Sequence, residues 1–255
     1  MERIVKDIYV ILLTIFAALA PIAPPAWATP SSVLYTPCTP YIQPFGVPHI
    51  TYDSYFNRTA DFPTDAGLTI GLLPWKNFQA EIGFDLFYPA ADPAQINFKA
   101  GFPEGAFGKY FPGLTAGIYS MGFHKDVNNF DILHFEAGKT LPKIGSVSIG
   151  GYRGLTPELM ESAGGADQDW GYMASYYRTF EPLTDRVAFA ADYMSGKNVI
   201  GGGGAGLYFW FNKSIDLILG WVWFNDRELN YPYRNGVFTI QLDVDFNLKR
   251  KLEGS

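Results

Sequence analysis

The sequence is poor in several features that other classes of protein depend on. It holds one cysteine, Cys38, and three histidines in 255 residues. A disulfide framework and a cysteine-rich metal site are therefore excluded. Only 17% of the residues are charged, and 25 acidic residues outnumber 19 basic ones. A nucleic-acid partner, which needs a basic patch or stripe, is not expected.

Long apolar runs are also missing beyond the N-terminus. There, a short basic region precedes an apolar stretch over residues 8–23, and the triplet Ala-Trp-Ala at 26–28 offers small residues for cleavage. This pattern predicts a signal peptide over residues 1–28. The longest uncharged stretch near the C-terminus, residues 198–212, is shorter than a spanning helix and is interrupted by glycines.

What the mature chain does have is alternation. In residues 78–86 every even position is apolar, and every odd position is polar or glycine. Residues 238–246 repeat this pattern. A period of two residues is typical of β-strands. The sequence predicts about twelve strands, near 49–58, 65–74, 77–88, 94–102, 112–123, 129–139, 143–152, 169–180, 185–195, 200–211, 215–225 and 236–247.

The lengths of these segments and of their connections predict a membrane barrel. Each segment is close to the 9–11 residues that a tilted strand needs to cross a bilayer. Short turns alternate with longer polar connections, apart from the long turn at 103–112. A soluble β-sandwich or lipocalin-like barrel alternates too, but the low charge content and the few Lys or Glu residues on the strands favour the membrane.

We therefore predict an all-β fold, a transmembrane antiparallel β-barrel of about twelve strands over residues 49–247. A Pro-rich periplasmic leader over residues 29–48 precedes it, and a basic periplasmic tail over 248–255 follows it. Both termini are expected in the periplasm, because both ends of such barrels lie on the side of the short turns. Cys38 falls in the leader and is expected to be unpaired.

Several stretches resemble known outer-membrane proteins. FPTDAGLTIGLLPWKNFQAEIGFDL is similar to the strand–turn–strand units of Gram-negative porin-like barrels, and FTIQLDVDF, ending at Phe246, resembles their final strand. KAGFPEGAFG, ADYMSGKNVIGGGGAGLYFWF and GWVWFND resemble a group of proteobacterial outer-membrane barrel proteins. The resemblance implies this fold and a bacterial outer-membrane location, and it implies no activity. The tail NLKRKLEGS after Phe246 departs from the pattern.

The polar parity of each strand gives the candidate lumen residues. They are Gln79, Glu81, Asp85, Lys99, His134, Glu136, Arg178, Arg186, Asp192, Asp216, Gln241, Asp243 and Asp245. Carboxylates outnumber cations in this set, and rings of carboxylates favour cations in a water-filled pore. The sequence thus predicts a passive, porin-like channel for small hydrophilic solutes with a mild preference for cations.

Other functions are weighed on the same residues. In the alternative interpretation, the charges pair across the interior and fill it. The protein is then a structural or adhesive barrel that binds an unidentified protein through long outer loops at 153–168 and 225–235. An enzyme is not predicted, because the His124, Asp126, Asp131 and His134 group lacks a nucleophile motif. No cofactor and no metal are expected. The partners expected are outer-membrane lipid and small solutes.

The glycine run at 201–204 is considered as a phosphate-binding loop and rejected. A phosphate-binding loop needs a following helix, and here a strand follows. The run is therefore expected to be a flexible outer loop or a point of close packing in the barrel.

Overall fold

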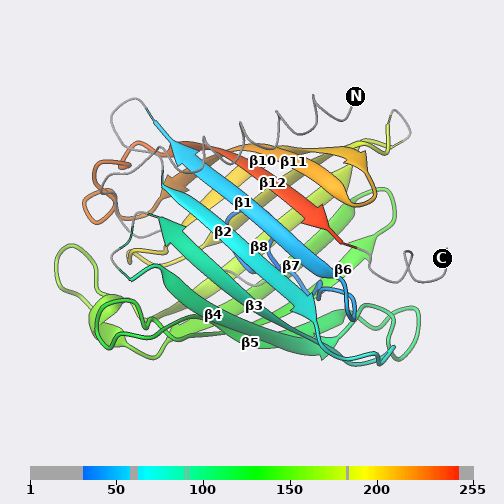
Figure 1. Cartoon of the computed structure of the whole chain (residues 1–255), viewed down its shortest axis with the longest axis horizontal. Helices are drawn as coiled ribbons and strands as arrows, with labels where there is room; N and C mark the ends of the chain where they lie inside the picture. The colour runs from blue at the N-terminus through cyan, green and yellow to red at the C-terminus, as the bar shows by residue number, and fades with distance from the viewer. Residues whose placement is uncertain (1–30, 58–62, 89, 91, 182–183, 247–255) are drawn as a thin grey trace, which may run out of the picture.

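The computed structural model describes residues 31–57, 63–88, 90, 92–181 and 184–246. The predicted signal peptide and the basic tail lie outside these residues. Twelve antiparallel strands form one closed barrel in which every strand pairs with its neighbours in sequence and β1 pairs with β12 (Figure 1). The predicted all-β barrel of about twelve strands is confirmed.

The strands are listed here in chain order. They are β1 (Pro48–Phe56), β2 (Thr64–Gly71), β3 (Gln79–Tyr88), β4 (Ala94–Phe102), β5 (Gly113–Gly122), β6 (Ile132–Leu141), β7 (Gly145–Gly154), β8 (Trp170–Thr179), β9 (Val187–Met194), β10 (Gly202–Asn212), β11 (Ile215–Phe224) and β12 (Val237–Asp245). One 3₁₀ turn, η1 (Pro157–Leu159), lies between β7 and β8. Among the described residues, no helix has the length and apolar character to cross a membrane.

The two ends of the barrel differ. The described parts of the connections 57–63, 89–93, 123–131, 155–169, 195–201 and 225–236 lie at one end, called the loop end here. The described parts of the connections 72–78, 103–112, 142–144, 180–186 and 213–214 lie at the other end, called the turn end. β1 starts and β12 finishes at the turn end, since His49 pairs with Asp245. In outer-membrane barrels the longer loops face outward from the cell.

The outer face of the wall is apolar. Along β3, Ile82, Phe84 and Leu86 are each about two-fifths exposed, whereas Glu81 and Asp85, on the alternate positions, are buried. Strand β6 repeats this arrangement, with Leu133 and Phe135 outside and His134 and Glu136 inside. A closed ladder leaves no unpaired strand edge, so this apolar face can lie in hydrocarbon. The barrel is built for a membrane.

A charge on this face should destabilise the barrel. Phe84 lies in the middle of β3 and points outward. Phe84→Arg is expected to lower the free energy of unfolding by about 2–4 kcal/mol, because a cation near the bilayer midplane loses its hydration. Denaturant unfolding in phospholipid vesicles measures the change. Phe84→Leu, which stays apolar, is the matched control, and equal stability of the Arg and Leu variants would contradict a lipid-facing Phe84.

The lumen is not empty, because the chain before β1 lies inside it. Residues 31–43, called the lumen segment here, contact wall residues of β3, β4, β8, β9, β10 and β12. In Figure 1 the blue start of the described chain is visible behind the front strands. The sequence assigned this stretch to a Pro-rich periplasmic leader, with no position relative to the lumen. The structure places it within the barrel.

Candidate functional site

The lumen holds most of the side chains that alternation predicted there. Eight of them are less than one-tenth exposed: Glu81, Asp85, Lys99, His134, Glu136, Asp192, Asp216 and Gln241. Gln79, Asp243 and Asp245 share the inward parity of their strands and are partly exposed near the turn end. The period of two residues puts these side chains on one face of the closed sheet.

The two predicted arginines are not among the buried lumen residues. Arg178 is exposed on β8, where the inward positions are Met173 and Ser175 and the outward parity includes Tyr172. Arg186 is exposed and precedes β9, in the connection at the turn end. Arg178 therefore faces outward, and the prediction of its inward position is wrong. Arg186 shares the parity of the buried Ala188 and Ala190, but it lies before the strand begins and is exposed.

Two carboxylates that the prediction missed also face inward. Asp53 of β1 pairs with Gln241, and Asp65 of β2 is 4% exposed and pairs with Asp53. The carboxylates on lumen-facing strand positions are then Asp53, Asp65, Glu81, Asp85, Glu136, Asp192, Asp216, Asp243 and Asp245. Among the described strand positions that face the lumen, Lys99 is the only lysine or arginine, so the interior is strongly acidic.

Part of this acidic surface gathers near β1 and β12. His49 places Nδ1 3.0 Å from an oxygen of Asp245 and Nε2 3.5 Å from an oxygen of Asp243. A small cavity of about 40 Å³ is lined by Asp53, Asp65 and other polar side chains. In the part of the chain that the structure describes, no group of three or more His, Cys, Asp or Glu residues is arranged to hold a metal ion.

The histidines weighed as an enzymatic group are not brought together. His124 is exposed, and its Nδ1 lies 2.8 Å from an oxygen of Asp92. His134 is buried in the lumen, where its Nδ1 bonds Glu136. The first belongs to the loop end and the second to the wall, so they form two separate acid–histidine pairs.

Asp192 holds the inner tip of the lumen segment. One of its carboxylate oxygens accepts the backbone N–H groups of Leu34 at 3.0 Å, Tyr35 at 2.8 Å and Thr36 at 2.8 Å. Asp192 is 3% exposed and lies two residues before the end of β9 at the loop end. A carboxylate that accepts several N–H bonds makes strong, charge-assisted contacts. The segment thus reaches deep into the barrel.

Glu81 holds both legs of the segment near the turn end. Its carboxylate accepts bonds from the N–H of Ser31 at 2.9 Å, the hydroxyl of Ser31 at 2.8 Å and the N–H of Gln43 at 2.5 Å. Lys99 lies 3.5 Å from Glu81 and donates to the carbonyls of Ser31 at 2.7 Å and Thr39 at 3.4 Å. Burial of this ion pair requires the extra partners that the segment supplies.

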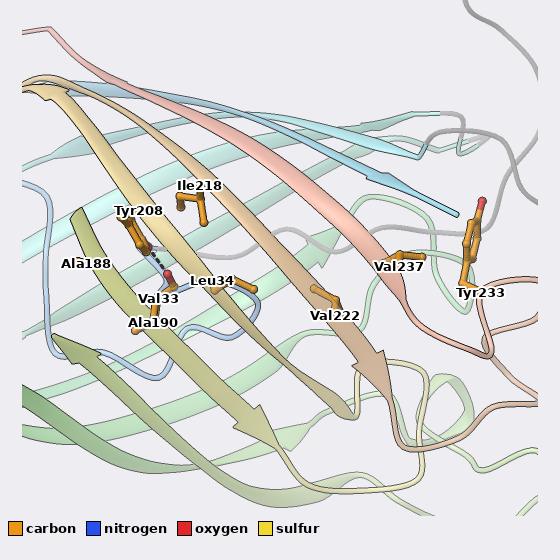
Figure 2. Close-up of a cluster of buried hydrophobic side chains, with 9 residues drawn as sticks. All are labelled: Val33, Leu34, Ala188, Ala190, Tyr208, Ile218, Val222, Tyr233 and Val237. Carbon is orange, nitrogen blue, oxygen red and sulfur yellow. Dashed lines mark hydrogen bonds between the residues drawn. The ribbon is translucent and has the colours of Figure 1, made fainter. Parts of the chain in front are cut away.

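Leu34 lies against two glycines of β10, Gly204 and Gly206. A side chain at Gly204 would place Cβ 2.2 Å from Leu34 Cδ2, and one at Gly206 would lie 2.7 Å from Leu34 Cδ1. Figure 2 shows Leu34 beside β10, and next to it Val33, whose carbonyl accepts a bond from the Tyr208 hydroxyl. Residues 201–204 were expected to be a flexible outer loop or a point of close packing. Close packing is observed from Gly202 onward, where the glycines belong to β10.

Cys38 lies at the middle of the segment and is completely buried. Its carbonyl accepts a bond from the Ser175 hydroxyl on β8 at 2.5 Å. Pro37 and Pro40 flank it and have no N–H group to satisfy inside the barrel. The accessibility of this free thiol therefore reports whether the lumen segment is in place.

Comparisons with known proteins agree with the fold. No family model matches the chain, and no curated protein is similar to it in sequence. The KdgM porin structure has a TM-score of 0.53 at 10% identity, covering 78% of this chain and 99% of that one. The NanC porin has a TM-score of 0.48 at 9% identity, covering 79% and 100%.

A third structure, an outer membrane channel from Pseudomonas putida F1, has a TM-score of 0.45 at 12% identity and covers 80% of this chain and 96% of that one. At these identities the likeness concerns the fold, and the KdgM porin alone of the three passes a TM-score of 0.5. The closed wall of twelve strands, its apolar outer face and the likeness to the KdgM porin identify the chain as an outer-membrane β-barrel of porin-like fold.

Proposed function

We propose that the barrel is a channel for small hydrophilic solutes with a mild preference for cations, and that the lumen segment is its gate. The observation that carries this proposal is the acidic lining: nine inward carboxylates face one lysine. A barrel that served only as a scaffold would be expected to balance the charges it buries. An excess of one sign suits a path that attracts ions of the other sign.

The way the segment is attached supports gating. Its hydrogen bonds to the wall go to side chains such as Glu81 and Asp192, and Val33 and Leu34 add apolar contacts; it forms no strand pairing over residues 31–43. All twelve strand pairings of the wall can persist when these bonds are exchanged for water. Withdrawal of the segment toward the turn end would leave Lys99 and the acidic lining in contact with water. The mechanism has no catalytic step and uses no cofactor.

The alternative is a barrel with a permanently filled lumen that binds a protein partner through its outer loops. The buried lumen segment favours it, because side chains and segment together occupy the interior. The partner in that case would meet the connections 155–169 and 225–236, the longest at the loop end. Conductance separates the two functions, since a filled structural barrel passes no ions.

The test is planar-bilayer recording of the full mature chain in a salt gradient. We expect discrete conductance steps with low open probability and a reversal potential on the cation side. Asp243→Lys, in the lumen, should move the reversal potential toward anions, whereas Asp185→Lys, in an exposed turn, should change it little. A folded barrel that stays silent, also after Asp192→Ala, would exclude the channel and leave the filled barrel.

A further inference from the structure

A second, larger cavity lies at the loop end, above the lumen segment. It has a volume of about 580 Å³, within the roughly 300–1,000 Å³ typical of small-molecule sites. Leu34 and Tyr35 of the lumen segment belong to its floor, and loop residues from 158–165 and 229–233 belong to its roof. Parts of the chain that are far apart in the sequence therefore line this cavity together.

The lining of this cavity differs from the rest of the lumen. Tyr119 and Met194 from the wall and Phe130 and Ile200 from the connections are all nearly buried and contribute apolar surface. Porin lumens are ordinarily polar, because water fills them. An apolar chamber above an acidic lumen is not needed to conduct hydrated ions, so it calls for another explanation.

Charge in the cavity has one sign. Asp53, Glu158 and Glu161 line it, and among the described lining residues there is no lysine or arginine. Tyr35, Tyr55 and Tyr233 add ring faces. Aromatic faces and carboxylates both attract organic cations, and the carboxylates disfavour anions of the same shape.

The roof is held in place by a contact between the two longest loops. Asp226 accepts a bond from the N–H of Ala163 at 3.0 Å and bonds from Glu228 and Leu229 at 3.0 and 3.1 Å. Partial burial opposes ionisation of Asp226, but these N–H donors outweigh it and lower its pKa below the usual value. The carboxylate is thus ionised at neutral pH, and the roof is a built feature of the fold.

We propose that this cavity is a binding site for a small hydrophobic molecule that carries a positive charge, such as an aromatic or alkyl amine. Its apolar body would lie against Tyr119, Phe130 and Met194, and its cationic group would lie toward Glu158, Glu161 or Asp53. The proposal does not depend on conduction, since the cavity exists with the lumen segment in place.

The test uses two probes with one body and opposite charges, 4-phenylbutylammonium and 4-phenylbutyrate. Each is titrated into the full mature chain in nonionic detergent by calorimetry, with empty micelles as the blank. We expect saturable binding of the ammonium probe and at least tenfold weaker binding of the carboxylate probe. Conductance is not measured, so a failure here and a failure of the channel are distinguishable.

Variants assign the binding to the cavity. Glu158→Gln together with Glu161→Gln should weaken binding of the ammonium probe at least fivefold, and Glu228→Gln, an exposed acid of the neighbouring loop, should leave it unchanged. Tyr233→Ala, a second change in the roof, should weaken it as well. Heat-modifiable mobility on gels verifies folding of each variant. Three results would overturn the proposal: no saturable binding of the ammonium probe, equal binding of the two probes, or a double variant (Glu158→Gln with Glu161→Gln) that binds the ammonium probe as tightly as Glu228→Gln does.

Discussion

Replacing Asp192 by alanine is expected to open the barrel. The variant removes the acceptor of three backbone N–H groups, those of Leu34, Tyr35 and Thr36. A hydrogen bond to a charged group contributes about 1.5–3 kcal/mol, and a buried donor left without a partner is costly. Allowing for non-additivity, we expect the equilibrium to move by about 3–6 kcal/mol toward the withdrawn segment, roughly a hundredfold to ten-thousandfold.

Planar-bilayer recording measures this effect as the fraction of time that single channels are open. Asp216→Ala is the matched control, because it removes another buried lumen carboxylate that makes no hydrogen bond to residues 31–43 in the described part of the chain. It should leave the open fraction near that of the unmodified protein. If both variants raise the open fraction equally, or neither raises it, Asp192 does not hold the lumen segment in the barrel.

Loss of Asp192 is expected to release only the tip of the lumen segment, because the second anchor, Glu81 with Lys99, holds the segment near the turn end. Glu81 and Lys99 hold the two legs near the turn end. When Asp192 no longer holds the tip, the two legs remain bound to Glu81 and Lys99, and water can replace the segment in these hydrogen bonds. Glu81→Gln should therefore add to the effect of Asp192→Ala, since the two anchors lie on different strands and share no hydrogen-bond partner.

The wall was predictable from the sequence because strand alternation is local. Ile82, Phe84 and Leu86 follow the same two-residue period as the carboxylates between them, and one choice of face then assigns the whole strand. The rule failed on β8, where Met173 faces inward and Tyr172 outward, so that polarity gives no contrast. Arg178 was assigned to the wrong face for this reason.

The missed acids have a related cause. On β1 both faces carry polar or aromatic groups, with Asp53 and Tyr55 on one and Tyr52 and Ser54 on the other. Alternation there is weak, and only the pairing with Gln241 of β12 shows which face is inward. The position of Asp65 follows from its pairing with Asp53.

The lumen segment was beyond prediction, because its contacts are long-range. Tyr35 and Asp192 are 157 residues apart, and Ser175 and Cys38 are 137 apart. Proline-rich sequence has no period that indicates a face, and nothing local distinguishes a leader outside the barrel from one inside it. Gly204 and Gly206 could not have indicated this position, because the residue that they accommodate, Leu34, lies in another part of the chain.

Gly204 allows the proposed gate to be tested from the side of the wall. Gly204→Val is expected to expel Leu34, because a Cβ at this position meets Leu34 Cδ2 at 2.2 Å and no wall atom closer than Asp192 Oδ1 at 3.5 Å. Overpacking of this kind costs about 1–3 kcal/mol. The population with the segment withdrawn should rise roughly fivefold to a hundredfold, and valine suits a strand.

Cys38 reports this change without any engineered label, as it is the sole cysteine of the sequence and is completely buried. We expect a polar maleimide to label it slowly in the unmodified barrel and faster in Gly204→Val by the same factor. Leu34→Gly in the Gly204→Val background restores the space that the valine needs, so labelling should slow again. If the double variant is labelled as fast as Gly204→Val, the valine acts through the wall, and the fit of Leu34 against β10 does not hold the gate closed.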